Sequence, residues 1–435
     1  LRILLSYNNA GIDAELVGGV IQPQFESYKI EDQWSSYGWN VFKLENANEM
    51  DQVVGVLKTM EDWDESDRRP MIVVGNTTKG WWPGAVNGEI PGYGEQIISY
   101  QSHPYAFAMN SEYFVALAKT FENRYGVTFQ GIEDGPTSDE RGRILQYKHN
   151  IDVVMSVLEK DGLGKWIGDT LAEIGDSVSD KPKLRINNNI DPFLDDRLRP
   201  GNAPREPISV SVTNALSGET KDIDIKLFEK PGVKQGSRRA ISEIIKWVNY
   251  VTENRLVLLA ADLADSINVE KGALWGEFDP VKNPTGNRLR SAIQEAGNVS
   301  TAIGLVSQSA SLDPKQHSGV WAMSGSYGAF TPLMYLPVRV WSQQNQDSPF
   351  RLGVLNVLAG HSGPETAADA RTHFGIFSPQ VWKLFPREHV INLSFWDYND
   401  VTPGYLAAAE IAARDPKVGV IVLEVARPDF PVVDR

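Results

Sequence analysis

The chain has 435 residues, a formal net charge of -14 and no cysteine. This length is enough for two or three domains with cores of their own, and the charge argues against a nucleic-acid partner and against an anionic membrane surface. Without cysteine there is no disulfide, thiolate metal site or cysteine nucleophile, so a metal would need oxygen or imidazole ligands, which favours magnesium or calcium. No apolar run approaches the roughly 20 residues that span a bilayer.

The first third of the chain predicts a parallel sheet with helical connections. Apolar, strand-like segments lie at 1–7, 39–44 and 69–75. Helical periodicity is found between them, at 26–37 and 46–60. The order strand, helix, strand, helix, strand is typical of an α/β domain.

The middle of the chain carries weaker signals. The Gly- and Pro-rich stretch 76–94 is too long for a simple connection, which favours a functional loop, and it leads to His103 and a predicted helix at 111–125. Short amphipathic helices are predicted at 151–158 and 166–174. The polar, Pro-rich run 181–207 that follows them is interpreted as a partly ordered connection between domains.

A second α/β block occupies the rest of the chain. Helices are predicted at 237–252, 288–302, 332–343 and 406–414, and strands at 255–261, 350–358, 390–393 and 418–425. Neither block has a GxGxxG fingerprint after its first strand, which argues against an ordinary Rossmann dehydrogenase. The predicted fold class is α/β, with two mostly parallel-sheet domains.

The loop 360–377 (GHSGPETAADARTHFGIF) contains two of the six histidines, His361 and His373, together with Asp369. It follows an apolar segment, and loops of this kind present polar chemistry at the edge of an α/β sheet. From composition alone, a surface loop without a function is an equally good interpretation.

Glu295 lies between the apolar Ile293 and the small residues Ala296 and Gly297. A carboxylate that loses hydration in such a setting can donate or share a proton near neutral pH. For a glutamate considered alone, a solvated helix position is the more common alternative.

Six motifs, in the right order over most of the chain, resemble those of transketolase, a thiamine diphosphate enzyme. They are Glu295, Gly297 and Gly304; His361, Asp369 and His373; Arg239, Ser242 and Glu243; Ala261, Asp262, Leu263 and Ser266; Asn8, Ile12 and Asp13; and Ser36 to Trp39. The resemblance implies the thiamine diphosphate-binding type of fold. It assigns 1–135 to the later part of the diphosphate-binding domain, 136–225 to a partly helical connection and 226–435 to the pyrimidine-binding domain.

The resemblance also implies the residues that bind the cofactor. Glu295 would hydrogen-bond the aminopyrimidine ring, Tyr327 and Phe330 would stack on it, and Asp262 would lie close by. Asn8 through its side chain and Ala10 through its carbonyl would bind magnesium (or calcium) at the diphosphate.

Substrate-binding residues follow from the same resemblance. His361, His373 and His103 would line the substrate channel as catalytic groups, and Asp369 would bind the hydroxyl next to the scissile carbon. Arg239 and Ser266 would bind the phosphate of the substrate. The resemblance places Trp396 where the family has a second phosphate-binding arginine.

The implied activity is transfer of a two-carbon ketol unit from a ketose (phosphate) to an aldose (phosphate) through the C2 carbanion of thiamine diphosphate. The implied state is a cytoplasmic homodimer with active sites at the subunit interface. Two alternatives stay open: a decarboxylating 2-oxo-acid dehydrogenase E1 component, and a non-catalytic subunit of a split transketolase-like assembly.

Two parts of the family pattern have no match in this sequence. One is a G-D-G motif, which supplies an aspartate ligand for the metal and would lie about twenty residues before Leu1. The other is a third domain after the last strand. We therefore expect either that the chain is a fragment or that a second chain supplies these parts.

Overall fold

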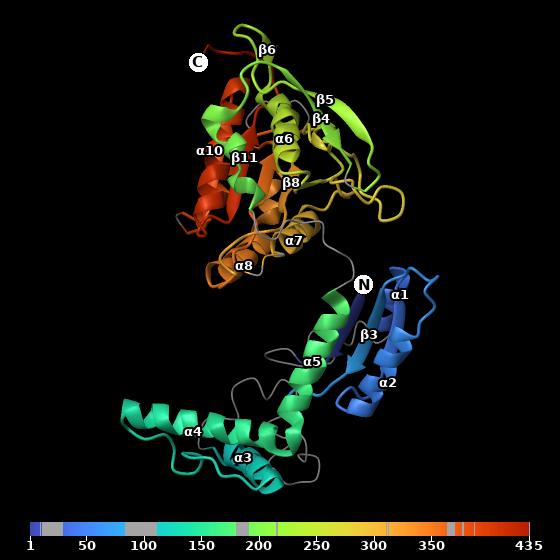
Figure 1. Cartoon of the computed structure of the whole chain (residues 1–435), viewed down its shortest axis with the longest axis vertical. Coiled ribbons are helices and arrows are strands. Elements are labelled where there is room, and N and C mark those ends of the chain that lie inside the picture. The colour runs from blue at the N-terminus through green and yellow to red at the C-terminus, as the bar shows by residue number, and fades with distance from the viewer. Residues whose placement is uncertain are drawn as a thin grey trace. The chain divides into compact units, whose positions relative to one another are not determined.

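The computed structural model describes residues 1–8, 10, 29–82, 111–179, 191–214, 216–309, 311, 313–362, 370–375, 378–386 and 388–434. They belong to two compact units, Leu1–Lys181 and Pro182–Arg435 (Figure 1). Among the described residues, no helix has both the length and the apolar character needed to cross a membrane.

The first unit contains a three-stranded parallel sheet with the strand order β1-β3-β2. Its strands are β1 (Arg2–Tyr7), β2 (Asn40–Leu44) and β3 (Met71–Asn76), connected through α1 (Ile30–Ser36) and α2 (Met50–Glu61). The middle strand β3 is buried along almost its whole length, whereas β1 alternates between partly buried and exposed residues. The observed order confirms the strand–helix prediction for this part of the chain.

Three further helices complete the described part of the first unit. They are α3 (Glu112–Tyr125), α4 (Glu140–Glu159) and α5 (Leu163–Ser179). The side chain of Asp139 caps α4 by accepting a hydrogen bond from the Gly142 N–H at 2.7 Å. Both α4 and α5 are longer than the predicted segments 151–158 and 166–174, because a clear apolar period covers only part of each helix.

The second unit is built on a five-stranded, fully parallel sheet with the order β10-β11-β9-β8-β7. The strands are β7 (Leu256–Ala260), β8 (Trp321–Ser326), β9 (Leu355–Ala359), β10 (Val390–Phe395) and β11 (Val420–Val425). The helices are α6 (Ala240–Val251), α7 (Glu295–Val306), α8 (Tyr335–Gln346), α9 (Ser378–Val381) and α10 (Tyr398–Arg414). This arrangement confirms the predicted α/β class with a mostly parallel sheet.

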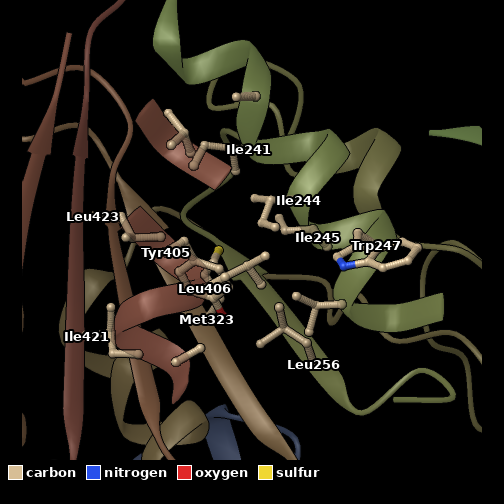
Figure 2. Close-up of a cluster of buried hydrophobic side chains, with 14 of the residues drawn as sticks. Ile241, Ile244, Ile245, Trp247, Leu256, Met323, Tyr405, Leu406, Ile421 and Leu423 are labelled. Carbon is tan, nitrogen blue, oxygen red and sulfur yellow. The ribbon is translucent and has the colours of Figure 1, made fainter. Parts of the chain in front are cut away.

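Helices cover both faces of the five-stranded sheet. Ile421 and Leu423 of β11 pack into one core with α6 and α10, as Figure 2 shows, while Val420 and Val422 pack into the opposite core with α7 and α8. Strands buried on both faces carry continuous apolar sequence rather than alternation. This explains why 418–425 was recognisable as a strand from its sequence.

Several elements differ from the sequence prediction. The predicted helix at 288–302 begins only at Glu295, since Arg288 lies in an extended segment that bridges to Leu258 at the edge of β7. The strand β8 and the antiparallel hairpin of β4 (Ile208–Thr213) and β5 (Thr220–Ile225) were not predicted. Small and polar residues in these segments hide the strand pattern. A short antiparallel ribbon joins β6 (Lys234–Gln235) and β12 (Phe430–Pro431).

A group of buried polar side chains in the second unit includes Asp191 and His317, which are 5% and 1% exposed. Burial raises the pKa of Asp191 to about 6, against the opposing charges of Arg351 and Arg255. Burial, with added repulsion from the same two arginines, lowers the pKa of His317 to about 4. Burial therefore shifts both side chains toward their neutral forms relative to the unfolded chain, although Asp191 is still mostly ionised at pH 7.

Replacing Asp191 with Asn should make the stability of the second unit depend more steeply on pH. Because the pKa of Asp191 is raised by folding, its contribution to the free energy of unfolding decreases as pH rises from about 4 to about 6. Because the pKa of His317 is lowered by folding, its contribution increases as pH rises from about 4 to about 6.5. The two dependences oppose each other in the unaltered chain.

In Asp191→Asn the opposing contribution of Asp191 is removed and that of His317 remains, so the slope of the free energy of unfolding against pH should become more positive by up to about 1.4 kcal/mol per pH unit over this interval. Urea unfolding of the full chain at a series of pH values measures the slope. Identical slopes for the variant and the unaltered chain would contradict the prediction.

The loop after β9 is packed tightly against Ile267. A Cβ atom at Gly360 would collide with the side chain of Ile267, which is fully buried. Gly360→Ala should therefore lower the free energy of unfolding by about 1–3 kcal/mol.

Gly304→Ala is the matched control, because no described atom outside the adjoining backbone of α7 lies within 4 Å of the added methyl group, and alanine favours α7 by up to about 1 kcal/mol. Thermal or urea unfolding distinguishes the two variants. Equal changes in the free energy of unfolding for both variants would mean that the Ile267 side chain can move away from the added methyl group without loss of stability.

Candidate active site

Most of the site residues predicted for the second unit lie at the carboxyl edge of its sheet. Strands β7, β8 and β9 end at this edge. The first residues after β9 and β7 bond to the end of β8, from the Gly360 N–H to the Ser326 carbonyl (2.8 Å) and from the Ala261 N–H to the Gly325 carbonyl (3.1 Å). The carboxyl ends of parallel strands are the usual position for binding sites in α/β proteins.

Six side chains meet at this edge and are called the imidazole cluster here. They are Arg238, Ser266, Tyr327, Phe330, His361 and His373. The Tyr327 ring lies 4.1 Å from the His361 ring and 5.8 Å from the His373 ring, measured between centroids. The hydroxyl groups of Tyr327 and Ser266 are 2.9 Å apart. The cluster thus joins residues from four segments: the turn before α6 and the loops that follow β7, β8 and β9.

The two described histidines of the cluster have different surroundings. His361 is fully buried, and its Nε2 lies 2.7 Å from Nη1 of Arg238. His373 is partly exposed, packs edge-to-face on Phe330 at 5.1 Å, and has its Nδ1 3.0 Å from the Thr372 hydroxyl. Partial burial, followed by repulsion from Arg427 and Arg239, lowers the pKa of Arg238.

Glu295 is the first residue of α7 and is only 7% exposed. Its Oε1 accepts a hydrogen bond of 2.8 Å from the hydroxyl of Ser326, the last residue of β8. The N-terminus of α7 favours a negative charge at this position. A carboxylate is therefore held close to the same sheet edge as the imidazole cluster.

Asp262 lies outside the imidazole cluster. It follows β7 with a left-handed backbone (φ 55°), and its N–H donates to the Ser291 carbonyl at 3.1 Å. Its side chain lines an open pocket of about 510 Å³ together with acidic and basic groups that include Asp265, Glu277 and Arg288. Within the described residues, the pocket and the cluster have no lining residue in common.

Arg239 is exposed and reaches Asp429, with Nη2 at 3.5 Å from Oδ2. Trp396 is 52% exposed, and its ring lies 5.8 Å from the ring of Phe430. Sequence reasoning missed Arg238 and Arg427, although a consecutive arginine pair before a helix and an arginine directly after an apolar strand are recognisable signals. Arg427 follows β11 and lies close enough to Arg238 to affect its pKa.

Asn8 and Ala10 belong to the first unit, at the end of β1. The Asn8 side-chain oxygen accepts a hydrogen bond of 3.0 Å from the Ala10 N–H, which forms a local turn. Amide and carbonyl oxygens are ligands that suit magnesium. Elsewhere in the described ranges, no group of three or more His, Cys, Asp or Glu side chains is arranged to hold a metal ion.

Two predicted site residues, His103 and Asp369, lie outside the described residues. Of the predicted set, the structure brings together Ser266, Tyr327 and Phe330 with His361 and His373. Glu295 and Asp262 lie at the same sheet edge beside this group.

No family model and no curated protein sequence matches the chain. Solved transketolases do match it. The transketolase of Campylobacter jejuni subsp. jejuni is similar with a TM-score of 0.55 at 12% identity, over 100% of this chain and 52% of that one. The transketolase of Leishmania mexicana matches with a TM-score of 0.57 at 14% identity, over 99% and 52% of the two chains.

A transketolase of Pichia stipitis in complex with sedoheptulose 7-phosphate matches with a TM-score of 0.53 at 13% identity, over 99% of this chain and 52% of that one. The chain therefore spans about half the length of the transketolases it matches. Together with the parallel sheets of both units, this likeness leads to one conclusion about architecture: the chain has a transketolase-like fold.

Proposed function

We propose that this chain contains the catalytic core of a transketolase-like transferase, which moves a two-carbon ketol unit from a ketose phosphate to an aldose phosphate. The observation that carries this proposal is the buried Glu295 carboxylate, hydrogen-bonded to Ser326 at the sheet edge that also holds the imidazole cluster. Similarity to a transketolase solved with sedoheptulose 7-phosphate supports the class of substrate.

The described residues fit thiamine diphosphate and magnesium. Glu295 offers a desolvated carboxylate suited to a pyrimidine ring nitrogen, and Asn8 and Ala10 offer neutral oxygens that suit a magnesium ion whose charge is balanced by a diphosphate. When bound, thiamine diphosphate supplies an electron sink for breaking and forming the carbon–carbon bond. Tyr327 and Phe330 would face the pyrimidine, and Asp262 would lie near it.

The chain's own residues would handle the substrate. His361, His373 and His103 would together bind sugar hydroxyls and stabilise a developing oxyanion, and imidazoles of this set would relay protons. Asp369 would select the stereochemistry of the hydroxyl next to the scissile carbon. Because Arg427 and Arg238 lie at the same edge as Ser266, this edge is suited to a phosphate group as well.

We assign 1–135 to the later part of the diphosphate-binding domain, 136–225 to a partly helical connection and 226–435 to the pyrimidine-binding domain. In this arrangement the working enzyme is a homodimer whose active sites lie between subunits. The experiments below use the assembly that contains the full chain.

Glu295→Gln should abolish exchange of the C2 proton of bound thiamine diphosphate, slowing it by about 100-fold or more, because an amide cannot share a proton as a carboxyl does. Proton NMR of quenched samples in deuterated water measures the exchange. Glu388→Gln is the control, because this exposed carboxylate forms an ion pair with Lys417 and is not one of the proposed site residues. Unchanged exchange in Glu295→Gln, with the dimer intact, would contradict the assignment.

Xylulose 5-phosphate, and not pyruvate, should form an adduct with the loaded enzyme, because the site offers imidazole and guanidinium groups for a phosphorylated polyol. Mass spectrometry of acid-quenched mixtures identifies the adduct. Reaction with pyruvate alone would favour a 2-oxo-acid dehydrogenase component instead. Absence of any heat of binding, when thiamine diphosphate and magnesium are titrated into the intact assembly, would favour a non-catalytic subunit.

A further inference from the structure

Arg238 makes two hydrogen bonds with one nitrogen atom. Its Nη1 lies 2.7 Å from Nε2 of His361 and 2.7 Å from the backbone carbonyl oxygen of Ser266. A guanidinium nitrogen of this type carries two hydrogens and has no acceptor capacity. Both hydrogens are therefore used, one on the carbonyl and one on the imidazole.

The imidazole must accept in this bond, because arginine only donates. A ring nitrogen that accepts carries no proton, so the proton of neutral His361 is on Nδ1. We infer that Arg238 is a positioning residue that holds His361 as the neutral Nδ1–H tautomer. Only the catalytic consequence of this inference rests on the proposed function, because the tautomer of His361 follows from contacts within the chain.

The surroundings of His361 oppose a second proton on its ring. Protonation of Nε2 would remove the acceptor of the Arg238 bond and place two cations 2.7 Å apart. The ring is fully buried, which adds a cost of lost hydration for the charged form. The charged and titratable side chains around the Arg238–His361 pair are Arg239, Arg427, Asp429, Tyr327 and His373.

The position of Arg238 is itself fixed by the backbone. Its N–H donates to the carbonyl of Ala426 at 3.2 Å, just after β11. The next residue, Arg239, is exposed and directed to Asp429 instead. The two consecutive arginines therefore provide a test residue and a matched control with the same chemistry.

In the proposed function the two histidines of the imidazole cluster then differ in role. His361 can present only a hydrogen-bond donor, through Nδ1, and is unsuited to act as a general base at Nε2. His373 is partly exposed and beside the Thr372 hydroxyl, and it takes the role of the imidazole that gains and loses protons. Arg238 thus determines which imidazole relays protons.

NMR of the full chain labelled with ¹⁵N-histidine tests this inference without cofactor or turnover. Long-range ¹H–¹⁵N spectra distinguish the tautomers, and His361→Asn identifies the His361 signals. In the unaltered chain, His361 should show a protonated Nδ1 and an unprotonated Nε2 from about pH 8 to about pH 5.

In Arg238→Gln, His361 should begin to titrate in this pH range, because the fixed cation is gone. Arg238→Lys keeps a cationic donor and should largely restore the neutral tautomer. Arg239→Gln should leave the His361 signals unchanged. The signals of the other histidines report whether each variant is folded, and the lysine variant preserves the test if the glutamine variant does not fold.

The inference would be overturned by a protonated Nε2 on His361 in the unaltered chain, or by the same change in the His361 signals for Arg239→Gln as for Arg238→Gln. Failure to bind thiamine diphosphate would overturn the proposed function but leave the tautomer result intact. If Arg238→Gln kept His361 as the Nδ1–H tautomer and catalysed the reaction normally, the role of Arg238 would be structural only. This result would also count against the inference.

Discussion

The parallel pairing of β7, β8, β9 and β11 is the constraint on which the rest of the second unit depends. Because paired parallel strands run in one direction, the loops that follow them leave from one edge. This pairing brings Ser266, Tyr327 and His361, which are up to 95 positions apart in sequence, into one cluster of touching side chains. Without the sheet register, none of these contacts would form.

Polar side chains at this sheet edge need hydrogen-bond partners and have little space. Helices cover both faces of the sheet, so a polar side chain at its end must find partners in a largely apolar environment. Glu295 finds a hydroxyl donor in Ser326, and His361 finds a guanidinium donor in Arg238. Space is also limited there, since Gly325 and Gly360 leave the room that Ile267 fills. The chemistry of the site and the packing of the core therefore depend on each other.

Sequence reasoning predicted the fold class and most of the strands that carry dense apolar sequence, such as β3 and β11. It missed β8, because small and polar residues such as Ser324 and Ser326 interrupt its apolar run, and it started the helix at 295–306 too early, because the extended segment before it contains helix-compatible residues. Tertiary pairing, rather than local propensity, determines both segments.

For the site, the resemblance to transketolase motifs predicted residues that the structure brings together, including Ser266, Tyr327 and His361. It could not predict which side chain would contact which. Arg239 matched a family motif, yet the neighbouring Arg238 is the residue that reaches His361, because side-chain direction depends on the local backbone turn. The roles of His103 and Asp369 stay predictions, since both lie outside the described residues.

The arginine pair lies in a short 3₁₀ turn, Ser237–Arg239, that leads into α6. Such a turn has three residues per rotation, so consecutive side chains leave it about 120° apart. One arginine is thereby turned toward the interior and the next toward solvent, although the two are chemically identical. A change of one residue in the phase of this turn would place a different residue at the inward position, although both arginines would still be present. The phase of the turn thus determines which arginine points inward. A sequence comparison that allows a shift of one position would not detect the loss of the inward arginine.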